Sequence, residues 1–117
     1  MVDGLPVTAL QMLVAVERAG AAVRPGELAA EMEMKSSNVA AALRLLEERS
    51  LVDRRPDPED GRKAFIDLTG KGRGLLADIR RDRYAWLQSA VDAVLTPREQ
   101  QLLLDAGELM ERLADRA

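Results

Sequence analysis

The sequence contains no cysteine and no histidine, and it has only three aromatic residues, Phe65, Tyr84 and Trp86. Without cysteine the chain can form neither a disulfide nor a thiol-based redox sensor. Because histidine is absent as well, only carboxylates remain among the usual zinc ligands. The core must therefore be built from aliphatic side chains, which suits packed helices better than a β-sandwich.

Long apolar runs and enzyme motifs are also missing. No stretch approaches the roughly 18 residues of a membrane span, and no signal peptide opens the chain. We therefore expect a soluble, cytoplasmic protein with no membrane partner. No nucleophile–base motif is present, and the glycine-rich stretch at residues 70–74 lacks the spacing of a phosphate-binding loop. The sequence predicts no enzymatic activity, no catalytic or metal-binding residues and no cofactor.

The charge balance is slightly acidic, with 17 basic and 20 acidic residues and a net charge of -3. An acidic excess weighs against nucleic-acid binding, because such binding draws much of its affinity from neutralising phosphates. The distribution of charge matters more than its sum, however. Basic residues gather in the middle of the chain, at Lys35, Arg44, Arg54, Arg55, Arg62 and Lys63.

Apolar spacing and capping residues predict five helices. Thr8, at capping-box distance from Gln11, is expected to begin the first helix, and Gly20 to end it. The second is expected from Pro25 to about Met34 and the third from Ser36 to Arg49, opened by a cap among residues 36–38. Thr69 is expected to cap a long helix that runs to about Val94, and residues 96–99 form a capping box that begins the last helix.

The stretch from Leu46 to Thr69 predicts a helix end followed by a β-hairpin. Turn residues lie at Pro56, Pro58 and Gly61, between an outgoing strand and the apolar return strand at residues 64–68. A hairpin directly behind a helix is typical of a winged helix-turn-helix. We therefore predict a mainly α fold with a small β-hairpin wing and two C-terminal helices. Residues 1–117 are expected to form one domain, with a DNA-binding core at about 8–69 and dimerisation helices at about 70–117.

The sequence resembles the MarR family of bacterial transcription regulators over residues 5–113. The matching motifs are residues 8–11, 27–29, 37–39, 46–49 with 51–52, and above all Arg54-Arg-Pro-Asp-Pro-Glu-Asp-Gly-Arg62 with Leu68-Thr69. The resemblance implies that Arg62 enters a minor groove and that Asp60 orients this arginine or its loop. Family members usually carry a long N-terminal helix, whereas about seven residues precede Thr8 here, so part of the usual dimer interface is expected to be absent. Ser50 stands where the family pattern commonly has glycine.

The resemblance also assigns the start of the third helix to base recognition in the major groove. Asn38 and Arg44 are of types that read adenine and guanine edges, whereas Ala40 and Ala41 permit close approach. Ser36 and Ser37 could contact DNA or cap the helix. Arg54 and Arg55 are expected to contact the phosphate backbone, although one of them could instead pack its stem along the strand. Lys63 is a further candidate for DNA contact. The alternative for the wing is an ordinary solvated hairpin in which Asp57, Glu59 and Asp60 pair with Arg55, Arg62 and Lys63.

The last two helices carry apolar stripes that could be core or a subunit interface, with buried packing expected for Tyr84 and Trp86. We predict a homodimeric repressor or activator that binds a pseudo-palindromic operator in double-stranded DNA, with moderate, salt-sensitive affinity. Control by a small-molecule effector is a further option. The alternative is a winged-helix protein-interaction module that has lost DNA binding, which the acidic net charge favours.

Overall fold

The structure is a computed structural model that describes residues 4–20 and 22–116. Residues 1–3 and 117, the ends of the predicted domain, lie outside the described residues. The chain divides into two compact units, Met1–Asp78 and Ile79–Ala117. Its elements are α1 (Val7–Ala19), α2 (Pro25–Met32), α3 (Ser36–Glu48), β1 (Val52–Pro56), β2 (Ala64–Leu68), α4 (Gly70–Val94) and α5 (Pro97–Arg116).

The first unit contains all the buried apolar side chains of the described residues, from Leu5 to Leu76. On α3 these are Val39, Leu43 and Leu46, the stripe that helical spacing predicts. The core is aliphatic, as the composition predicts, and it packs α1, α2 and α3 against one another and against the hairpin. This packing leaves the opposite side of α3 to solvent.

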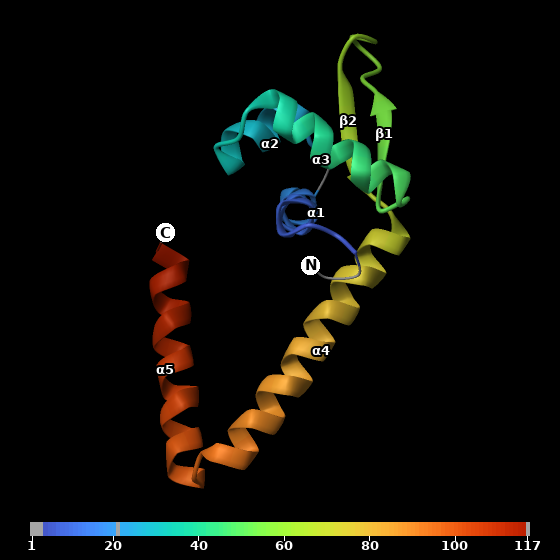
Figure 1. The fold of residues 1–117 in the computed structure, drawn as a ribbon. Coiled ribbons are helices and arrows are strands. Elements are labelled where there is room, and N and C mark those ends of the chain that lie inside the picture. The colour runs from blue at the N-terminus through green and yellow to red at the C-terminus, as the bar shows by residue number, and fades with distance from the viewer. Residues whose placement is uncertain (1–3, 21, 117) are drawn as a thin grey trace. The chain divides into compact units, whose positions relative to one another are not determined.

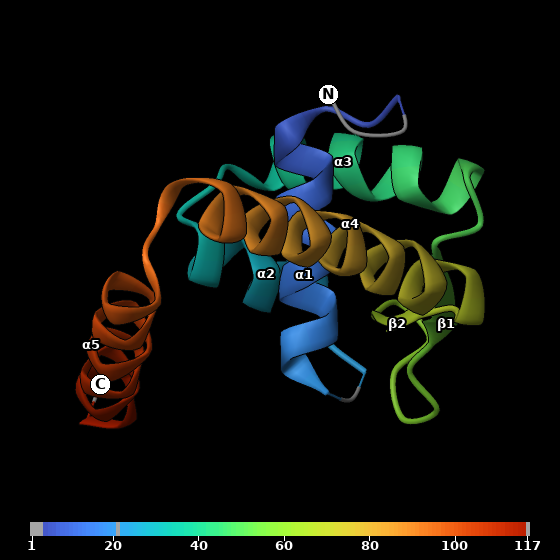
Figure 2. The same ribbon diagram turned by 90° about the horizontal axis from the view of Figure 1, so that it is seen from below.

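The strands β1 and β2 form the predicted antiparallel hairpin, with Val52 opposite Leu68 and Pro56 opposite Ala64. The hairpin projects beyond α2 and α3 (Figures 1 and 2). Its inner end joins the segment before α2, since Val23 and Ile66 exchange backbone hydrogen bonds of 3.1 and 2.7 Å. The wing is thus attached to the helices through its second strand.

Three predicted helix starts or ends differ from the structure. The first helix begins at Val7 with Pro6 as N-cap, so Thr8 does not cap it. The second ends at Met32, because Glu33 adopts a left-handed conformation with φ 52°. The three polar residues at 36–38 do not cap α3 either: Lys35 is its N-cap, and its carbonyl accepts the first helical hydrogen bonds. Residues 36–38 are therefore exposed on the first turn.

Other local predictions are confirmed. Gly20 ends α1 in a left-handed conformation with φ 72°. Ser50 has φ 59°, a left-handed conformation that costs a residue with a side chain about 1–2 kcal/mol and that glycine would adopt without this cost. The Thr69 hydroxyl accepts a hydrogen bond of 3.0 Å from the N–H of Gly72. Thr96 and Glu99 form the reciprocal capping box of α5, at 2.9 and 3.2 Å.

Gly72 and Gly74 lie on the first turns of α4 but in different surroundings. A Cβ at Gly72 would lie 2.3 Å from the Leu51 carbonyl oxygen, whereas a Cβ at Gly74 would meet nothing within 4 Å. We expect Gly72→Ala to destabilise the protein by about 1–3 kcal/mol through overpacking. Gly74→Ala should stabilise it by up to about 1 kcal/mol, since alanine favours the helix. Urea denaturation of both variants checks this, and equal effects would contradict it.

The second unit has almost no interior of its own. Not one residue of α5 is buried, and Trp86 on α4 is 72% exposed. The expectation that Tyr84 and Trp86 are buried is therefore wrong for the single chain, because two helices cannot enclose large side chains between them. The exposed apolar side chains of this unit are Tyr84, Trp86, Leu87, Val94, Leu102, Leu103, Leu104, Leu109, Met110 and Leu113.

Candidate nucleic-acid interface

The exposed face of α3 carries most of the residues that the sequence singles out for base contact. Ser36, Ser37 and Asn38 are exposed on its first turn, and Ala41 and Arg44 follow on the next turns. Ala40 is half-buried, since it borders the core face. The two alanines leave the middle of this surface without side-chain hydrogen-bonding groups. Polar contacts by α3 are thus restricted to its first turn and to Arg44.

The tip of the wing presents Arg62 to solvent, with a side chain that is 94% exposed. Asp60 organises the turn before it, because its Oδ1 accepts a hydrogen bond of 3.1 Å from the Arg62 N–H. The same oxygen lies 3.5 Å from Nε of Arg62. Lys63 is also exposed, and its N–H donates to the Asp60 carbonyl at 3.0 Å. The geometry thus holds the backbone of the tip while it leaves the Arg62 side chain exposed to solvent.

Arg54 and Arg55 lie on β1 and are paired within the chain. Nε of Arg54 donates to Glu47 at 2.7 Å, and Nε of Arg55 donates to Asp67 at 2.6 Å. Both side chains remain about half exposed. A phosphate could therefore reach them, but their charges are partly offset. Their partners are not those of the solvated-hairpin alternative, since Glu47 lies on α3 and Asp67 on β2.

A small cleft of about 120 Å³ brings together predicted residues from two elements. Ser36 and Ala40 of α3 and Arg54 of β1 line it, together with Pro25 and Gly26 at the start of α2. These residues come from the helix-turn-helix and from the wing. The structure thus places the beginning of α3 beside the outgoing strand, as a shared contact surface for DNA would require.

Asp57 is the residue that sequence reasoning missed. It is buried, with 7% exposure, and its Oδ2 accepts a hydrogen bond of 2.7 Å from Nη2 of Arg24. Its Oδ1 accepts a hydrogen bond of 2.8 Å from the Glu59 N–H. On sequence grounds its expected partners were nearby hairpin cations. Its actual partner lies 33 residues earlier, and nothing in the local pattern signals that distance.

The surroundings of Asp57 lower the pKa of its carboxyl. The hydrogen bond from Glu59 is the main cause, and the charge of Arg24 contributes, which together outweigh the opposing effect of burial. Both groups favour the ionised carboxylate. Asp57 is therefore charged in the folded protein even under mildly acidic conditions.

The lowered pKa predicts a pH-dependent contribution to stability. Because the folded-state pKa lies below the unfolded one, ionised Asp57 stabilises the fold above the ordinary value of 3.8, and this contribution is lost as the pH falls through the folded-state pKa. Asp57→Asn should therefore lower the melting temperature at pH 7, by an amount that shrinks below pH 4. Thermal unfolding from pH 7 to 3 measures it. A gap independent of pH would contradict the prediction.

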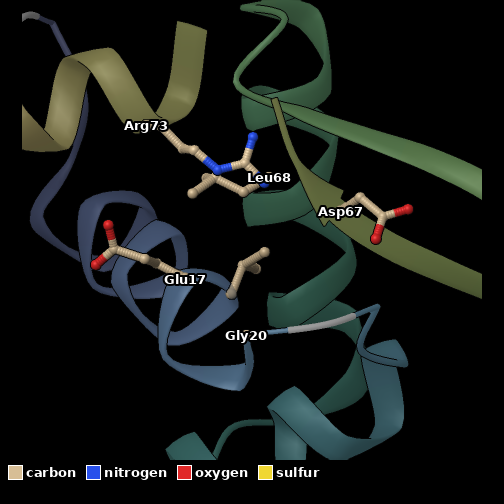
Figure 3. A pocket seen from close by; sticks show the side chains of 6 residues that line it. Glu17, Gly20, Asp67, Leu68 and Arg73 are labelled. Carbon is tan, nitrogen blue, oxygen red and sulfur yellow. The ribbon is translucent and has the colours of Figure 1, made fainter. Parts of the chain in front are cut away.

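A further pocket, of about 100 Å³, lies between the end of α1, β2 and the start of α4 (Figure 3). Arg73 reaches across Leu68, while the carboxylates of Glu17 and Asp67 point to different sides (Figure 3). The pocket thus gathers no convergent set of acidic groups, and it contains no predicted site residue. Among the described residues, no acidic cluster suited to a metal ion occurs. Within the same residues, no helix has the length and apolar character to cross a membrane.

Comparison with known proteins identifies similar chains. The model of the MarR family matches residues 3–63. An uncharacterized HTH-type transcriptional regulator from Mycobacterium bovis is 32% identical over 94 residues, which are 80% of this chain and 65% of the relative. The chain thus spans just under two thirds of the length of the curated relatives it matches.

Solved structures share the fold. A putative transcriptional regulator from Pseudomonas aeruginosa PA01 superposes with a TM-score of 0.84 at 41% identity, over 96% of this chain and 77% of the other. FabT from Streptococcus pneumoniae, solved in complex with DNA, has a TM-score of 0.66 at 20% identity, over 97% and 79% of the two chains. These matches confirm the predicted fold class, a helical protein with a two-stranded wing.

Proposed function

The chain belongs to the MarR family, and we propose that it is a cytoplasmic, homodimeric regulator of transcription that binds double-stranded DNA sequence-specifically. In this proposal α3 lies in the major groove, and the wing, residues 53–68, reaches the adjacent minor groove. The protein acts by binding and not by catalysis. FabT, which shares the fold, was solved with DNA.

The observation that carries the proposal is the exposure of the Arg62 side chain at the tip of the wing. Its side chain is 94% exposed, while Asp60 holds the backbone of the turn. An isolated exposed ion pair contributes little to stability, so the arrangement has little value for folding. It suits an arginine that enters a narrow minor groove, where the electrostatic potential is strongly negative.

The remaining contacts are proposed from exposure and pairing. Arg44, Asn38 and Lys63 are exposed, and we assign the first two to base edges and Lys63 to the phosphate backbone. Ser36 and Ser37, which do not cap α3, also face phosphates in this proposal, and Ala40 and Ala41 allow close approach of the helix. Arg54 and Arg55 contribute less, because each already pairs with a carboxylate.

The second unit is the proposed site of homodimerisation. Its apolar side chains are exposed along α4 and α5, and a patch of that extent on a soluble protein marks an interaction surface. A twofold-symmetric pair would place two recognition helices about 34 Å apart, on successive major grooves of a pseudo-palindromic operator. An effector could act through an open groove of about 590 Å³ that includes Asn38 and Ala41 of α3, because its occupant would compete with DNA.

The test is DNA selection from fragments of the source genome, followed by footprinting of the selected site. We expect protection of a pseudo-palindrome and, for about six phosphate contacts, an affinity loss of about 10³-fold between 50 and 200 mM salt. Absence of binding to every fragment at low salt would reject the proposal. Capture of another protein that is unaffected by Arg62→Ala would then favour the interaction-module alternative.

A further inference from the structure

Arg24 and Asp57 connect the helix-turn-helix to the base of the wing. Arg24 immediately precedes α2, and its N–H donates to Glu27 at 3.2 Å in the first turn of that helix. Its guanidinium donates to Asp57 at 2.7 Å. Asp57 is the one buried charged side chain among the described residues. The Arg24 side chain is 35% exposed and that of Asp57 is 7% exposed, so removal of Arg24 would leave a largely buried carboxylate without its counter-charge, which is costly.

Asp57 also closes the loop of the wing across its base. Its N–H donates to the Lys63 carbonyl at 3.1 Å, and its Oδ1 accepts from Glu59. The tip turn lies within this closed loop, where Lys63 N–H donates to the Asp60 carbonyl at 3.0 Å. The loop from 57 to 63 is therefore tied at both its base and its tip, and a change of direction at Asp57 would move Arg62 with it.

The segment before α2, which contains Arg24, is held to the return strand β2 by two further contacts. Val23 pairs with Ile66 through the backbone, and the Arg24 guanidinium lies 4.8 Å from the centre of the Phe65 ring. The Arg55 guanidinium lies 5.0 Å from the same ring. An isolated two-stranded hairpin is only marginally stable in water. The hairpin also packs against α1 and α3, and its contacts with the segment before α2 add a second attachment that fixes its direction.

We propose that the Arg24–Asp57 ion pair is a positioning element for DNA recognition. It holds the wing so that Arg62 and the exposed face of α3 contact the same DNA duplex. This inference rests on the proposed DNA-binding function. Asp57 does not itself contact DNA, since it is buried and negatively charged. Its effect on DNA affinity depends on Arg62, so a substitution of Asp57 should weaken binding only while Arg62 is present.

Asp57→Asn provides the sharpest test. Asparagine keeps an oxygen that can accept from Glu59 but loses the charge that pairs with Arg24. Removal of a negative charge beside DNA should by itself tighten binding. We expect instead a loss of about tenfold in operator affinity, within the range of a lost wing contact. Asp53→Asn is the matched control, because Asp53 is exposed on β1, and it should bind at least as tightly as the natural protein.

A double-mutant cycle separates positioning from a general loss of structure. In an Arg62→Ala background, Asp57→Asn should cause almost no further loss, because both changes remove the same contact. Footprints of Asp57→Asn should lose minor-groove protection and keep major-groove protection. Arg24→Lys should retain more affinity than Arg24→Met, and this comparison also serves if Asp57→Asn does not fold.

Three outcomes would overturn the proposal while DNA binding by the natural protein stands. They are affinity of Asp57→Asn equal to or above that of the natural protein, an undiminished loss in the Arg62→Ala background, and equal affinities of Arg24→Lys and Arg24→Met. Failure of the natural protein to bind any DNA would instead reject the proposed function on which the inference rests.

Discussion

Replacement of Leu109 by glutamate is expected to convert the proposed homodimer into monomers. Leu109 is 55% exposed on α5, at the centre of a face that Leu102, Ala106 and Leu113 share by helical spacing. Full burial of an exposed leucine contributes about 1.5–3 kcal/mol, so burial of the exposed half of Leu109 contributes about 1–1.5 kcal/mol. A twofold-symmetric interface contains Leu109 twice, which gives a total of about 2–3 kcal/mol. The dissociation constant of the proposed dimer should therefore rise by about 30- to 150-fold. Burial of a carboxylate at the interface would add to the effect.

Light scattering coupled to size-exclusion chromatography measures this change directly. Leu104→Glu is the matched control. Leu104 is one of the exposed apolar side chains of α5, at 66% exposure, but it lies about 200° around the helix from Leu102 and so outside the face of Leu109 that we assign to the dimer. Both substitutions introduce the same charge, and glutamate is a good helix former. Monomers for both variants, or dimers for both, would contradict the assignment of this face.

Loss of the dimer should also weaken operator binding. Two half-sites bound by one dimer gain affinity because the second contact is made at a high effective concentration, an advantage of about 10²–10⁴-fold. Leu109→Glu should lose most of this advantage at a protein concentration below its new dissociation constant. Its affinity for a single half-site should remain unchanged, since α3 and the wing belong to the first unit.

Arg62→Ala should weaken operator binding by about 10- to 100-fold, which corresponds to about 1–3 kcal/mol for one specific contact. The side chain is 94% exposed, so its removal should leave the melting temperature almost unchanged. Fluorescence anisotropy with the selected operator, at several salt concentrations, measures both the affinity and its salt dependence. Footprints should show minor-groove protection lost beside each half-site.

Arg98→Ala is the control for the charge change. Arg98 is exposed in the first turn of α5, outside the proposed DNA surface, and its removal changes the net charge equally. We expect less than about a twofold effect from it, since a surface charge that makes no contact with DNA acts only through a screened field. If the two variants lose affinity equally, Arg62 acts as general positive charge and not as a wing contact.

Much of the fold could be predicted from local patterns. The stripe of Val39, Leu43 and Leu46 identifies the buried side of α3 because helical spacing brings these side chains to one face. Thr96 and Glu99 mark the start of α5 because a capping box is made within one turn. The prediction that one of residues 36–38 caps α3 was wrong. Each of these polar residues is able to cap a helix, but the helix begins one residue earlier, with Lys35 as its N-cap.

The sequence by itself determined the class of fold, the position of the wing and the residues at its tip, because these depend on contacts between near neighbours along the chain. Only the tertiary structure decided that Asp57 pairs with Arg24, that Val23 joins β2, and that no described residue of α5 is buried. Such features depend on packing between distant segments. The free energy of a buried ion pair or an uncovered face is set by its surroundings and not by its place in a motif.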